Sequence, residues 1–377
     1  MLGREDLGER IGGVLHGETD GNPLFLEQLT RCLVEEGVVR PGREPVLLDR
    51  LREIGIPKTV KRVIEKRLRK LDGDSLRLLR LASVVGRGFD MEVLAALTGH
   101  DEGNLAQKLS GLERAHLLSE AGTHDGTRYG FLHEAIRQTL YSQIGEKQRK
   151  RLHQKVGEVL EQRWTGSEGE GLDELAYHFL NGLDKEKAVK YGLRAADRSK
   201  ILYANERALE TYNRVLGMLG HGELEERVSV LESMAQVQEL VGQYGRAIGG
   251  YREILDIGSP RLSKEARASR LRKMGEVYER KGDYDEAVSA LETAMSLLGE
   301  TTGSAEAART LIAMGFILLR KGEYHRTRAL CLQALEISRR LGEKREMGFA
   351  YNVLGLASFR QGDFSQAVDC HQKSLTI

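Results

Sequence analysis

The sequence predicts a mainly α-helical chain that ends in a solenoid of stacked helix pairs. First, a triplet of glycine, a polar residue and an aromatic residue recurs at a fixed spacing near the C-terminal end, which is typical of stacked supersecondary units. The four copies are Gly242-Gln243-Tyr244, Gly282-Asp283-Tyr284, Gly322-Glu323-Tyr324 and Gly362-Asp363-Phe364. Second, charged residues make up 30% of the chain and only five prolines interrupt it, a helix-rich profile. Third, a single segment, residues 117–131, has the pattern of a β-hairpin.

Size and composition restrict the classes of protein that fit. A chain of 377 residues is too long for one hydrophobic core, so we expect two or three domains. The net charge of +1 predicts neither general nucleic-acid affinity nor a disordered acidic tail. No apolar run approaches the ~20 residues that span a bilayer, residues 1–17 lack the hydrophobic block of a signal peptide, and the three cysteines lie far apart. We therefore expect a cytoplasmic protein without membrane contact, disulfide framework or metal site.

Residues 1–55 contain a clear helix start. Asn22 is a good N-cap, and Pro23 suits the first helical position. An apolar stripe at helical spacing follows, and Gly37 ends it. From the residues alone, this segment is a capped helix and nothing more.

The string Gly21-Asn22-Pro23, followed by Phe25 and Glu27, resembles the Gly-x-Pro motif of signal-transduction NTPases with numerous domains (STAND NTPases), relatives of the AAA ATPases. In that family the motif lies in a small helical lid after the nucleotide-binding core, and its proline packs on the adenine. The resemblance implies that residues 1–55 are this lid, with Gly21, Asn22 and Pro23 at the edge of a nucleotide site. It also implies ATP or ADP with Mg²⁺ as the ligand of the complete protein.

The departure from that family is large. A phosphate-binding loop needs a glycine-rich backbone and a lysine, but the dipeptide Gly-Lys occurs nowhere in the chain. No apolar strand ending in paired acids precedes Gly21 to hold Mg²⁺. We expect the ATPase core to lie upstream of Met1. The chain alone is then expected to be no enzyme, to have no catalytic residues and to hold no cofactor of its own.

Residues 56–145 are expected to form helices followed by a hairpin, which is the order of a winged helix. The predicted helices run from Ile56 to Leu71, Asp74 to Val85, Met91 to Leu97 and Glu102 to Leu118. The segment Thr123-His124-Asp125-Gly126 then separates two apolar runs, and Asp-Gly at such a place favours a hairpin turn. The strings from Leu81 to Phe89 and from Phe131 to Ala135 resemble the winged-helix domain that follows the lid in STAND NTPases.

His133 begins the helix after the hairpin, and two interpretations stay open for it. In related switch ATPases a histidine near this place senses the phosphates of bound ADP, and a helix N-terminus suits an anion. Alternatively, His133 is a helix-start histidine that a backbone carbonyl satisfies. The run from His133 is not a zinc motif, because Arg137 replaces the second histidine.

DNA binding is the alternative function of residues 56–145. Between Pro57 and Gly88 there are ten Lys or Arg against three Asp or Glu, an excess that suits phosphates. The segment best placed as a recognition helix, Glu102 to Leu118, has two bases against two acids and no array of base-reading side chains. In the family that it resembles, this domain mostly packs on the nucleotide core.

Residues 146–186 are expected to link this domain to the repeats. Two helices, Glu146 to Arg163 and Asp173 to Asn181, flank the segment Thr165 to Gly171, whose glycines and acids predict a flexible linker. The string from Leu175 to Phe179 also resembles the entry to the repeats in STAND NTPases.

Residues 187–377 are predicted to form about five antiparallel helix pairs, the last of them truncated. In one pair, Gly275 and Tyr278 share a helix face, and Gly282 ends that helix where a left-handed residue is favoured. This spacing of small and aromatic residues resembles the tetratricopeptide repeat (TPR), although the period is longer than the usual 34 residues. Because Ile377 lies inside a second helix with no polar cap after it, we expect the native chain to continue.

In TPR arrays the first helix of each pair lines a concave groove, and here this face is the predicted binding site for a protein or peptide. The candidate residues are Arg272, Glu276, Arg280, Arg309, Phe316, Arg320, Asn352 and Arg360. Arg280, Arg320 and Arg360 form a ladder at the repeat spacing. Two interpretations stay open. The ladder is either a clamp for an acidic peptide or carboxylate, or a solvated face in which Glu276 and Glu279 pair locally with Arg280.

Together these features predict the regulatory, partner-binding arm of a signal-transduction ATPase. A partner on the repeats would change how lid and winged helix close over a nucleotide, which requires different affinities for the open and closed forms. The alternatives are a stand-alone TPR adaptor for protein–protein interaction and a winged-helix transcription regulator that binds DNA. A phosphate-binding loop encoded in frame upstream would favour the ATPase arm, and salt-dependent DNA binding through Lys61, Arg62, Lys66 and Arg69 would favour the regulator.

Overall fold

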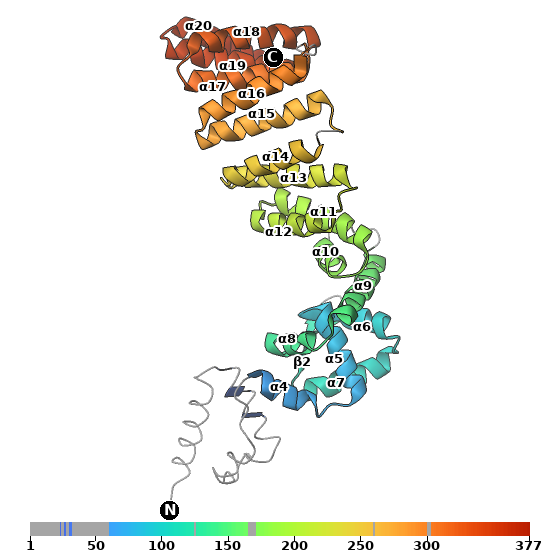
Figure 1. The fold of residues 1–377 in the computed structure, drawn as a ribbon. Helices are drawn as coiled ribbons and strands as arrows, with labels where there is room; N and C mark the ends of the chain where they lie inside the picture. The colour runs from blue at the N-terminus through green and yellow to red at the C-terminus, as the bar shows by residue number, and fades with distance from the viewer. Residues whose placement is uncertain are drawn as a thin grey trace, which may run out of the picture. The chain divides into compact units, whose positions relative to one another are not determined.

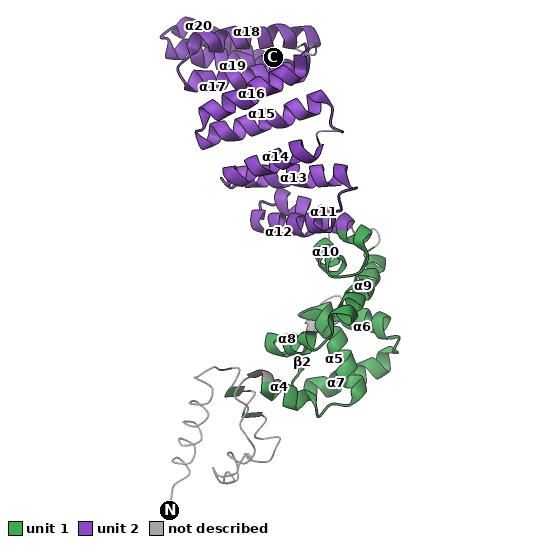
Figure 2. Cartoon of the chain, in the orientation of Figure 1, with its two compact units in different colours: residues 1–188 green, residues 189–377 purple. Residues whose placement is uncertain are grey.

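A computed structural model of the chain describes residues 60–123, 126–164, 171–258, 261–299 and 303–377, together with Pro23, Leu26, Glu27, Thr30 and Arg31. From residue 60 onward, the described elements are seventeen helices, α4 to α20, and three strands, which confirms the mainly α-helical class (Figure 1). The chain divides into two compact units, residues 1–188 and residues 189–377 (Figure 2). Most of the predicted lid, including Gly21 and Asn22, and the linker residues 165–170 lie outside the described residues.

Five helices of the first unit pack with a small antiparallel sheet. The helices are α4 (Val60–Leu68), α5 (Gly73–Val85), α6 (Met91–Thr98), α7 (Glu102–Arg114) and α8 (Glu134–Ser142), and the strands are β1 (Gly88–Asp90), β2 (Leu118–Thr123) and β3 (Gly126–Phe131). The strand order is β1-β3-β2, and both neighbours run antiparallel to β3. The expected hairpin is therefore present as β2 and β3, paired from Leu118 opposite Phe131 to Thr123 opposite Gly126.

Two elements of this unit differ from the predicted ones. α7 ends at Arg114 rather than at Leu118, because Leu117 and Leu118 are both buried in the core that surrounds the sheet. The strand β1 lies at Gly88–Asp90, where the sequence indicated only a helix break, and it places Phe89 in the same core. Burial of the apolar side chains of Leu117, Leu118 and Phe89 therefore accounts for both differences.

The two predicted linker helices are α9 (Glu146–Arg163) and α10 (Leu172–Leu180). They pack on each other through two buried histidines, with His153 Nδ1 and His178 Nδ1 3.0 Å apart. His178 Nε2 lies 3.2 Å from the carbonyl oxygen of Val85, and His153 Nε2 lies 2.9 Å from the hydroxyl oxygen of Tyr141. This polar network joins α10 and α9 to α5 and α8.

The second unit is a stack of antiparallel helix pairs. Its helices are α11 (Lys185–Ile201, which starts in the first unit), α12 (Asn205–Met218), α13 (Leu224–Leu240), α14 (Tyr244–Gly258), α15 (Lys264–Lys281), α16 (Tyr284–Leu298), α17 (Ala305–Arg320), α18 (Tyr324–Leu341), α19 (Lys344–Arg360) and α20 (Phe364–Thr376). One hydrophobic cluster runs through α13, α14, α15, α16 and α17, so neighbouring pairs share a core. None of the helices in the described ranges has the length and apolar character needed to cross a membrane.

Small residues set the spacing inside each helix pair. A side-chain carbon on Gly275 would lie 3.0 Å from Leu291 Cγ and 3.2 Å from the carbonyl oxygen of Ala287, so glycine allows α15 and α16 to approach closely. The turn glycines take left-handed φ angles, for example 95° at Gly282. At the turn between α11 and α12, Tyr203 takes this place with a φ of 57°.

Candidate functional site: a groove on the repeat unit

A groove of about 970 Å³ runs along α15, α17 and α19, the first helices of three successive pairs. Seven of the eight predicted groove residues line it, namely Arg272, Glu276, Arg280, Arg309, Phe316, Arg320 and Asn352. The eighth, Arg360, is exposed at the end of α19 and lies outside this lining. The structure adds Arg345 and Phe349 of α19, which the repeat pattern did not suggest.

The charged end of the groove is built from carboxylates that pair with arginines of neighbouring helices. Arg272 donates from Nε to Glu306 Oε1 at 2.7 Å and from Nη1 to Glu276 Oε1 at 2.6 Å. Glu306 is buried, so its charge depends on the arginines that pair with it, Arg272 above all. Burial acts to lower the pKa of Arg272, but attraction to Glu276 and Glu306 raises this pKa above its usual value.

Arg309 repeats the arrangement one helix pair further on. Its Nε donates to Glu346 Oε1 at 2.7 Å, and its Nη1 lies 3.6 Å from Glu306 Oε2. Burial acts to raise the pKa of the Glu346 carboxyl, but the hydrogen bond from Arg309 and further favourable contacts hold this pKa below its usual value. Arg272 and Arg309 therefore join α15, α17 and α19 through two buried carboxylates.

The arginine ladder also forms its ion pairs between repeats. Arg280 pairs with Glu239 of the preceding helix pair, and Arg320 Nε lies 3.4 Å from Glu279 Oε1. Glu276 pairs with Arg272 instead of Arg280. Arg280 and Arg320 are therefore paired with carboxylates of the preceding repeat, and the local pair of this face is Arg272 with Glu276.

Arg360 continues the ladder in sequence but not in its contacts. The residue that corresponds to Glu239 and Glu279 one repeat later is Leu319, which offers no carboxylate. Within the described ranges, Arg360 forms no ion pair. Arg360 therefore differs from Arg280 and Arg320, which line the groove and form ion pairs.

The other end of the groove is apolar and carries two arginine–aromatic pairs. Phe316 lies on α17 and Phe349 on α19, where 50% of the Phe349 surface is exposed. The Arg320 guanidinium lies over the Phe316 ring, 5.2 Å from its centroid, and that of Arg345 lies over the Phe349 ring at 5.5 Å. The apolar side chains that complete this end are Ile312, Ala313, Ile317, Val353 and Leu356.

The repeat pattern of the sequence does not indicate Arg345 and Phe349, because both residues depart from it. The residues forty positions earlier are Ala305 and Arg309, so neither position shows a recurring type. A search for aromatic residues at helix positions where the neighbouring repeat is charged would have found Phe349.

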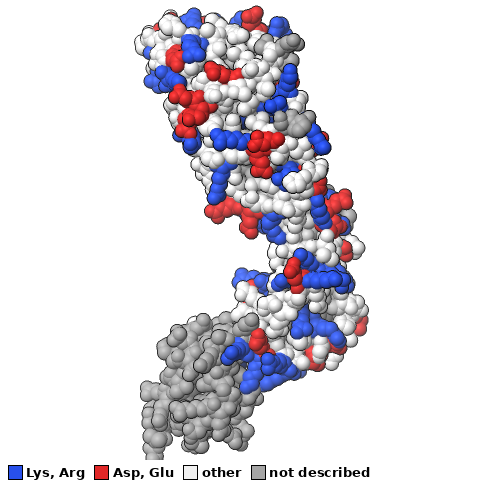
Figure 3. Space-filling model, in the orientation of Figure 1, with Lys and Arg blue, Asp and Glu red and all other residues white. Residues whose placement is uncertain are grey.

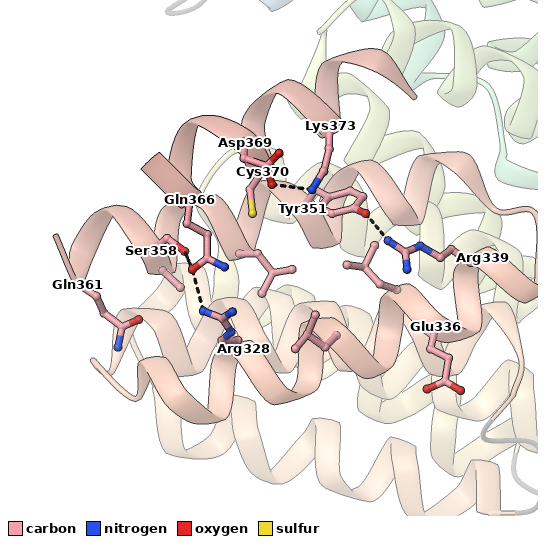
Figure 4. A pocket seen from close by; sticks show the side chains of 14 residues that line it. Arg328, Glu336, Arg339, Tyr351, Ser358, Gln361, Gln366, Asp369, Cys370 and Lys373 are labelled. Carbon is pink, nitrogen blue, oxygen red and sulfur yellow. Dashed lines mark hydrogen bonds and ion pairs between the residues drawn. The ribbon is translucent and has the colours of Figure 1, made fainter. Parts of the chain in front are cut away.

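A smaller cavity of about 350 Å³ lies among α18, α19 and α20 (Figure 4). Several of its polar groups already bond with one another, since Arg328 Nη1 donates to Gln366 Oε1 at 2.8 Å and Lys373 pairs with Asp369 at 2.6 Å. The groove therefore remains the better candidate for a binding site. Across the described residues, no group of three or more His, Cys, Asp or Glu is placed to hold a metal ion.

In the first unit, the structure places His133 against Glu27 of the motif that resembles the STAND lid. His133 is the N-cap of α8, and its Nε2 lies 3.1 Å from Glu27 Oε2. Arg31 Nη2 also donates to Glu27, at 2.9 Å, and Pro23 is exposed. The partner of the His133 ring is therefore a carboxylate rather than the backbone carbonyl of the second interpretation.

The basic stretch between Pro57 and Gly88 is partly engaged within the fold. Arg67 is buried and donates to the carbonyl oxygen of Ala115 at 2.5 Å. Arg87 lies 3.3 Å from the carboxylate of Glu134 on α8. Arg67 therefore serves packing within the first unit, whereas Arg87 forms a surface ion pair with its side chain 81% exposed.

Comparisons with solved structures find similar helical stacks. BtubC (BKLC) from P. vanneervenii is 18% identical over 57% of this chain and 89% of its own, with a TM-score of 0.46. A putative kinesin light chain from Podosopora anserina with nearly identical TPR-like repeats is 16% identical over 50% and 93%, with a TM-score of 0.41. YrrB, a TPR protein with an unusual peptide-binding site, is 14% identical over 52% and 92%, with a TM-score of 0.35. At these TM-scores the overlap is too coarse to transfer a ligand.

Comparisons of sequence are more specific about the C-terminal part. No curated protein sequence matches the chain. Residues 271–305 and residues 306–377 each match a family profile described as tetratricopeptide repeat. The C-terminal part of the chain therefore carries tetratricopeptide repeats, and these include the three helices that form the groove.

Proposed function

We propose that this chain is an adaptor that binds a segment of a partner protein in the groove along α15, α17 and α19. The observation that carries the proposal is Phe349, a large aromatic side chain half exposed in a groove beside Phe316 and Leu356. Apolar side chains that gather in a concave surface commonly mark a binding site. The TPR profile matches support the same function, because helix-pair solenoids use their concave surfaces to bind partners.

The ion pairs beneath the groove favour a rigid binding surface. Arg272 and Arg309 connect the three helices through Glu306 and Glu346, so the groove exists before a ligand arrives. A preorganised surface loses little conformational entropy when it binds. Covering one aromatic side chain contributes about 2 kcal/mol at roughly 25 cal/mol per Å². Measurable affinity therefore requires several contacts along the groove.

Selection from a random peptide library, with the full chain as the target, tests the adaptor function. Enriched peptides are expected to lose at least about tenfold in affinity for the Phe349→Ala variant, because a central aromatic contact is removed. The matched control is Phe364→Ala, which removes an exposed phenylalanine of α20 outside the groove. A library that yields no binder, or binders indifferent to Phe349→Ala, would contradict the proposed site.

The contact between His133 and Glu27 favours a second function for the first unit. We propose that residues 1–188 serve as the lid and winged-helix part of a STAND-type signal-transduction ATPase. The order of α4 to α8 around a three-stranded sheet supports a winged helix. A nucleotide phosphate that attracted His133 would compete with the Glu27 carboxylate, so the contact is suited to change with nucleotide state. The chain supplies only part of an ATP site, because it lacks the Gly-Lys dipeptide of a phosphate-binding loop.

The reading frame upstream of Met1 tests this second function. A phosphate-binding loop encoded there in frame would support it, and a frame without such a loop would contradict it. In a protein that contains both this phosphate-binding loop and the present chain, His133→Ala is expected to change the affinity for ADP severalfold. Phe349→Ala is expected to leave that affinity unchanged. Equal ADP affinity of the wild type and His133→Ala would remove His133 from the nucleotide site.

A further inference from the structure

We infer that the groove selects protein segments in which carboxylate side chains flank an apolar side chain. This inference rests on the adaptor function proposed above and names the chemistry of the partner. It follows from the depth of two carboxylates below their arginines, from two arginines that lie over aromatic rings, and from the apolar side chains of the same groove.

Two carboxylates of the groove, Glu279 and Glu346, lie deeper than the arginines that pair with them. The Glu279 side chain is 14% exposed, whereas its partner Arg320 is 55% exposed. The Glu346 side chain is 6% exposed, whereas its partner Arg309 is 43% exposed. At these two pairs a ligand that enters from solvent therefore meets a guanidinium before it meets a carboxylate, whereas at Arg272 the order is reversed, because Glu276 is 38% exposed and Arg272 13%.

Arg345 is the groove arginine that is best able to accept a new anion. It is exposed, and no carboxylate of the described residues lies within ion-pair distance of it. Its guanidinium lies over the Phe349 ring, as that of Arg320 lies over Phe316. An arginine that is attracted to an aromatic ring still carries five N–H donors, and two of them match the two oxygens of a carboxylate.

The two arginine–aromatic pairs lie on successive first helices, α17 and α19, and share the groove with an apolar floor. Ile312, Val353 and Leu356 contribute to that floor and offer no hydrogen bond. A segment laid along the groove therefore matches it best with an apolar side chain on the floor and carboxylates toward Arg320 and Arg345. This pattern of charge and apolar surface complements a peptide with alternating acidic and apolar residues.

The balance of charges argues for a protein segment and against a nucleic acid in the same groove. Four of the five groove arginines form ion pairs with glutamates. On the drawn face of the repeat unit, positive and negative side chains are interspersed (Figure 3). A surface with little net charge does not concentrate a polyanion by its long-range field. The affinity of the groove for a ligand must therefore come from short-range contacts. A peptide with both acidic and apolar side chains supplies such contacts.

Three labelled peptides of about eight residues, which span roughly 26 Å when extended, test the inference. The first alternates Asp with Leu and Phe, the second has Asn in place of every Asp, and the third has Ser in place of every Leu and Phe. Fluorescence anisotropy with the full chain gives the Kd of each. We expect the first peptide to bind at least about tenfold more tightly than either of the others.

Variants of Arg345 locate the carboxylate contact. Arg345→Gln is expected to weaken the acidic apolar peptide about tenfold and to leave the Asn peptide unchanged, because only the charge-assisted contact is lost. Arg345→Lys is expected to lie between, since lysine keeps the charge but loses the planar fork and the stacking. Arg360→Gln is the control, because it removes an exposed arginine outside the groove and is expected to change neither affinity.

The outcomes separate this inference from the adaptor function itself. If the Asn peptide binds as tightly as the Asp peptide and both depend on Phe349, the acidic preference is overturned while the adaptor function stands. If the Ser peptide binds as tightly as the first, the apolar requirement is overturned. If neither these peptides nor the library binders respond to Phe349→Ala, the groove is not the binding site and both proposals fall.

Discussion

Arg272 and Glu306 join two successive repeats, because the Nε of Arg272 donates to Glu306 Oε1 at 2.7 Å. Glu306 is buried, and without Arg272 its remaining cation among the described residues is Arg309, whose Nη1 lies 3.6 Å away, so the buried carboxylate loses its shorter ion pair. We expect Arg272→Met to lower the free energy of local unfolding of α15 and α17 by about 3 kcal/mol. Amide hydrogen exchange of peptides from these helices measures the effect, since each 1.4 kcal/mol corresponds to about a tenfold faster exchange.

Arg345→Met is the matched control for this prediction. Arg345 is exposed on α19 and has no carboxylate within ion-pair distance among the described residues, so its removal is expected to cost within about 0.5 kcal/mol. The double variant Arg272→Met with Glu306→Met is expected to recover part of the loss, because it removes the buried carboxylate that had lost its shorter ion pair. Equal exchange in Arg272→Met and Arg345→Met would show that the pair does not stabilise the stack.

The contrast between these two arginines also shows how far the sequence predicts the groove. The repeat spacing places Arg272 on the first helix of its pair, facing the groove. It does not name Glu306 as the partner, because that contact depends on the rotation between successive pairs. Arg345 and Phe349 carry the further inference, but they have no counterpart of the same type one repeat earlier, so no period reveals them.

The same limit holds in the first unit. The hairpin of β2 and β3 was predictable because its turn signal is local, whereas β1 is only three residues long and pairs with the distant β3. The contact between His133 and Glu27 joins residues 106 positions apart. Local patterns state which residues form a helix or a turn, but contacts of this range follow only from packing of the whole unit.

Tyr203 takes a turn position that glycine fills in the following repeats, and its φ of 57° is rare for a bulky side chain. Its side chain is 75% exposed, so a smaller residue loses little packing. We expect Tyr203→Gly to stabilise the second unit by about 0.5 to 1 kcal/mol, because relief of the left-handed strain exceeds the added freedom of glycine in the unfolded chain. Calorimetry should show a higher melting midpoint, and Gly242→Ala should lower it. A lower midpoint for Tyr203→Gly would show that this turn is not strained.

Gly275 and Gly355 hold the same place in their repeats but have different neighbours. A methyl group on Gly275 would meet Leu291 and the backbone oxygen of Ala287, whereas one on Gly355 would meet the ring of His371, which is only partly buried and able to move. We expect Gly275→Ala to cost about 1–3 kcal/mol and Gly355→Ala less than about 1 kcal/mol. Urea unfolding followed by circular dichroism measures both. A larger loss for Gly355→Ala would contradict the close approach of α15 and α16.

The buried histidine pair of the first unit predicts how its stability depends on pH. Burial lowers the pKa of His178 from 6.5 to about 4, although a hydrogen bond with the carbonyl of Val85 acts in the opposite direction. In the unfolded chain His178 takes up a proton below about pH 6.5, whereas the folded protein keeps it neutral until about pH 4. The unfolded state therefore binds more protons in this window, and stability falls as the pH falls through it. Above this window His178 makes no contribution to the pH dependence.

Fluorescence of Trp164 measures this dependence, because it is the only tryptophan of the chain and lies at the end of α9 in the first unit. We expect urea unfolding of this unit to show about 2 kcal/mol less stability at about pH 5 than at about pH 8. His178→Gln keeps an N–H group for the carbonyl of Val85 but cannot titrate, so it should lower the stability at about pH 8 and flatten the dependence between the two values. An equally steep dependence in His178→Gln would place the titrating group elsewhere, and a flat wild type would show that protonation of His178 is tolerated in the fold.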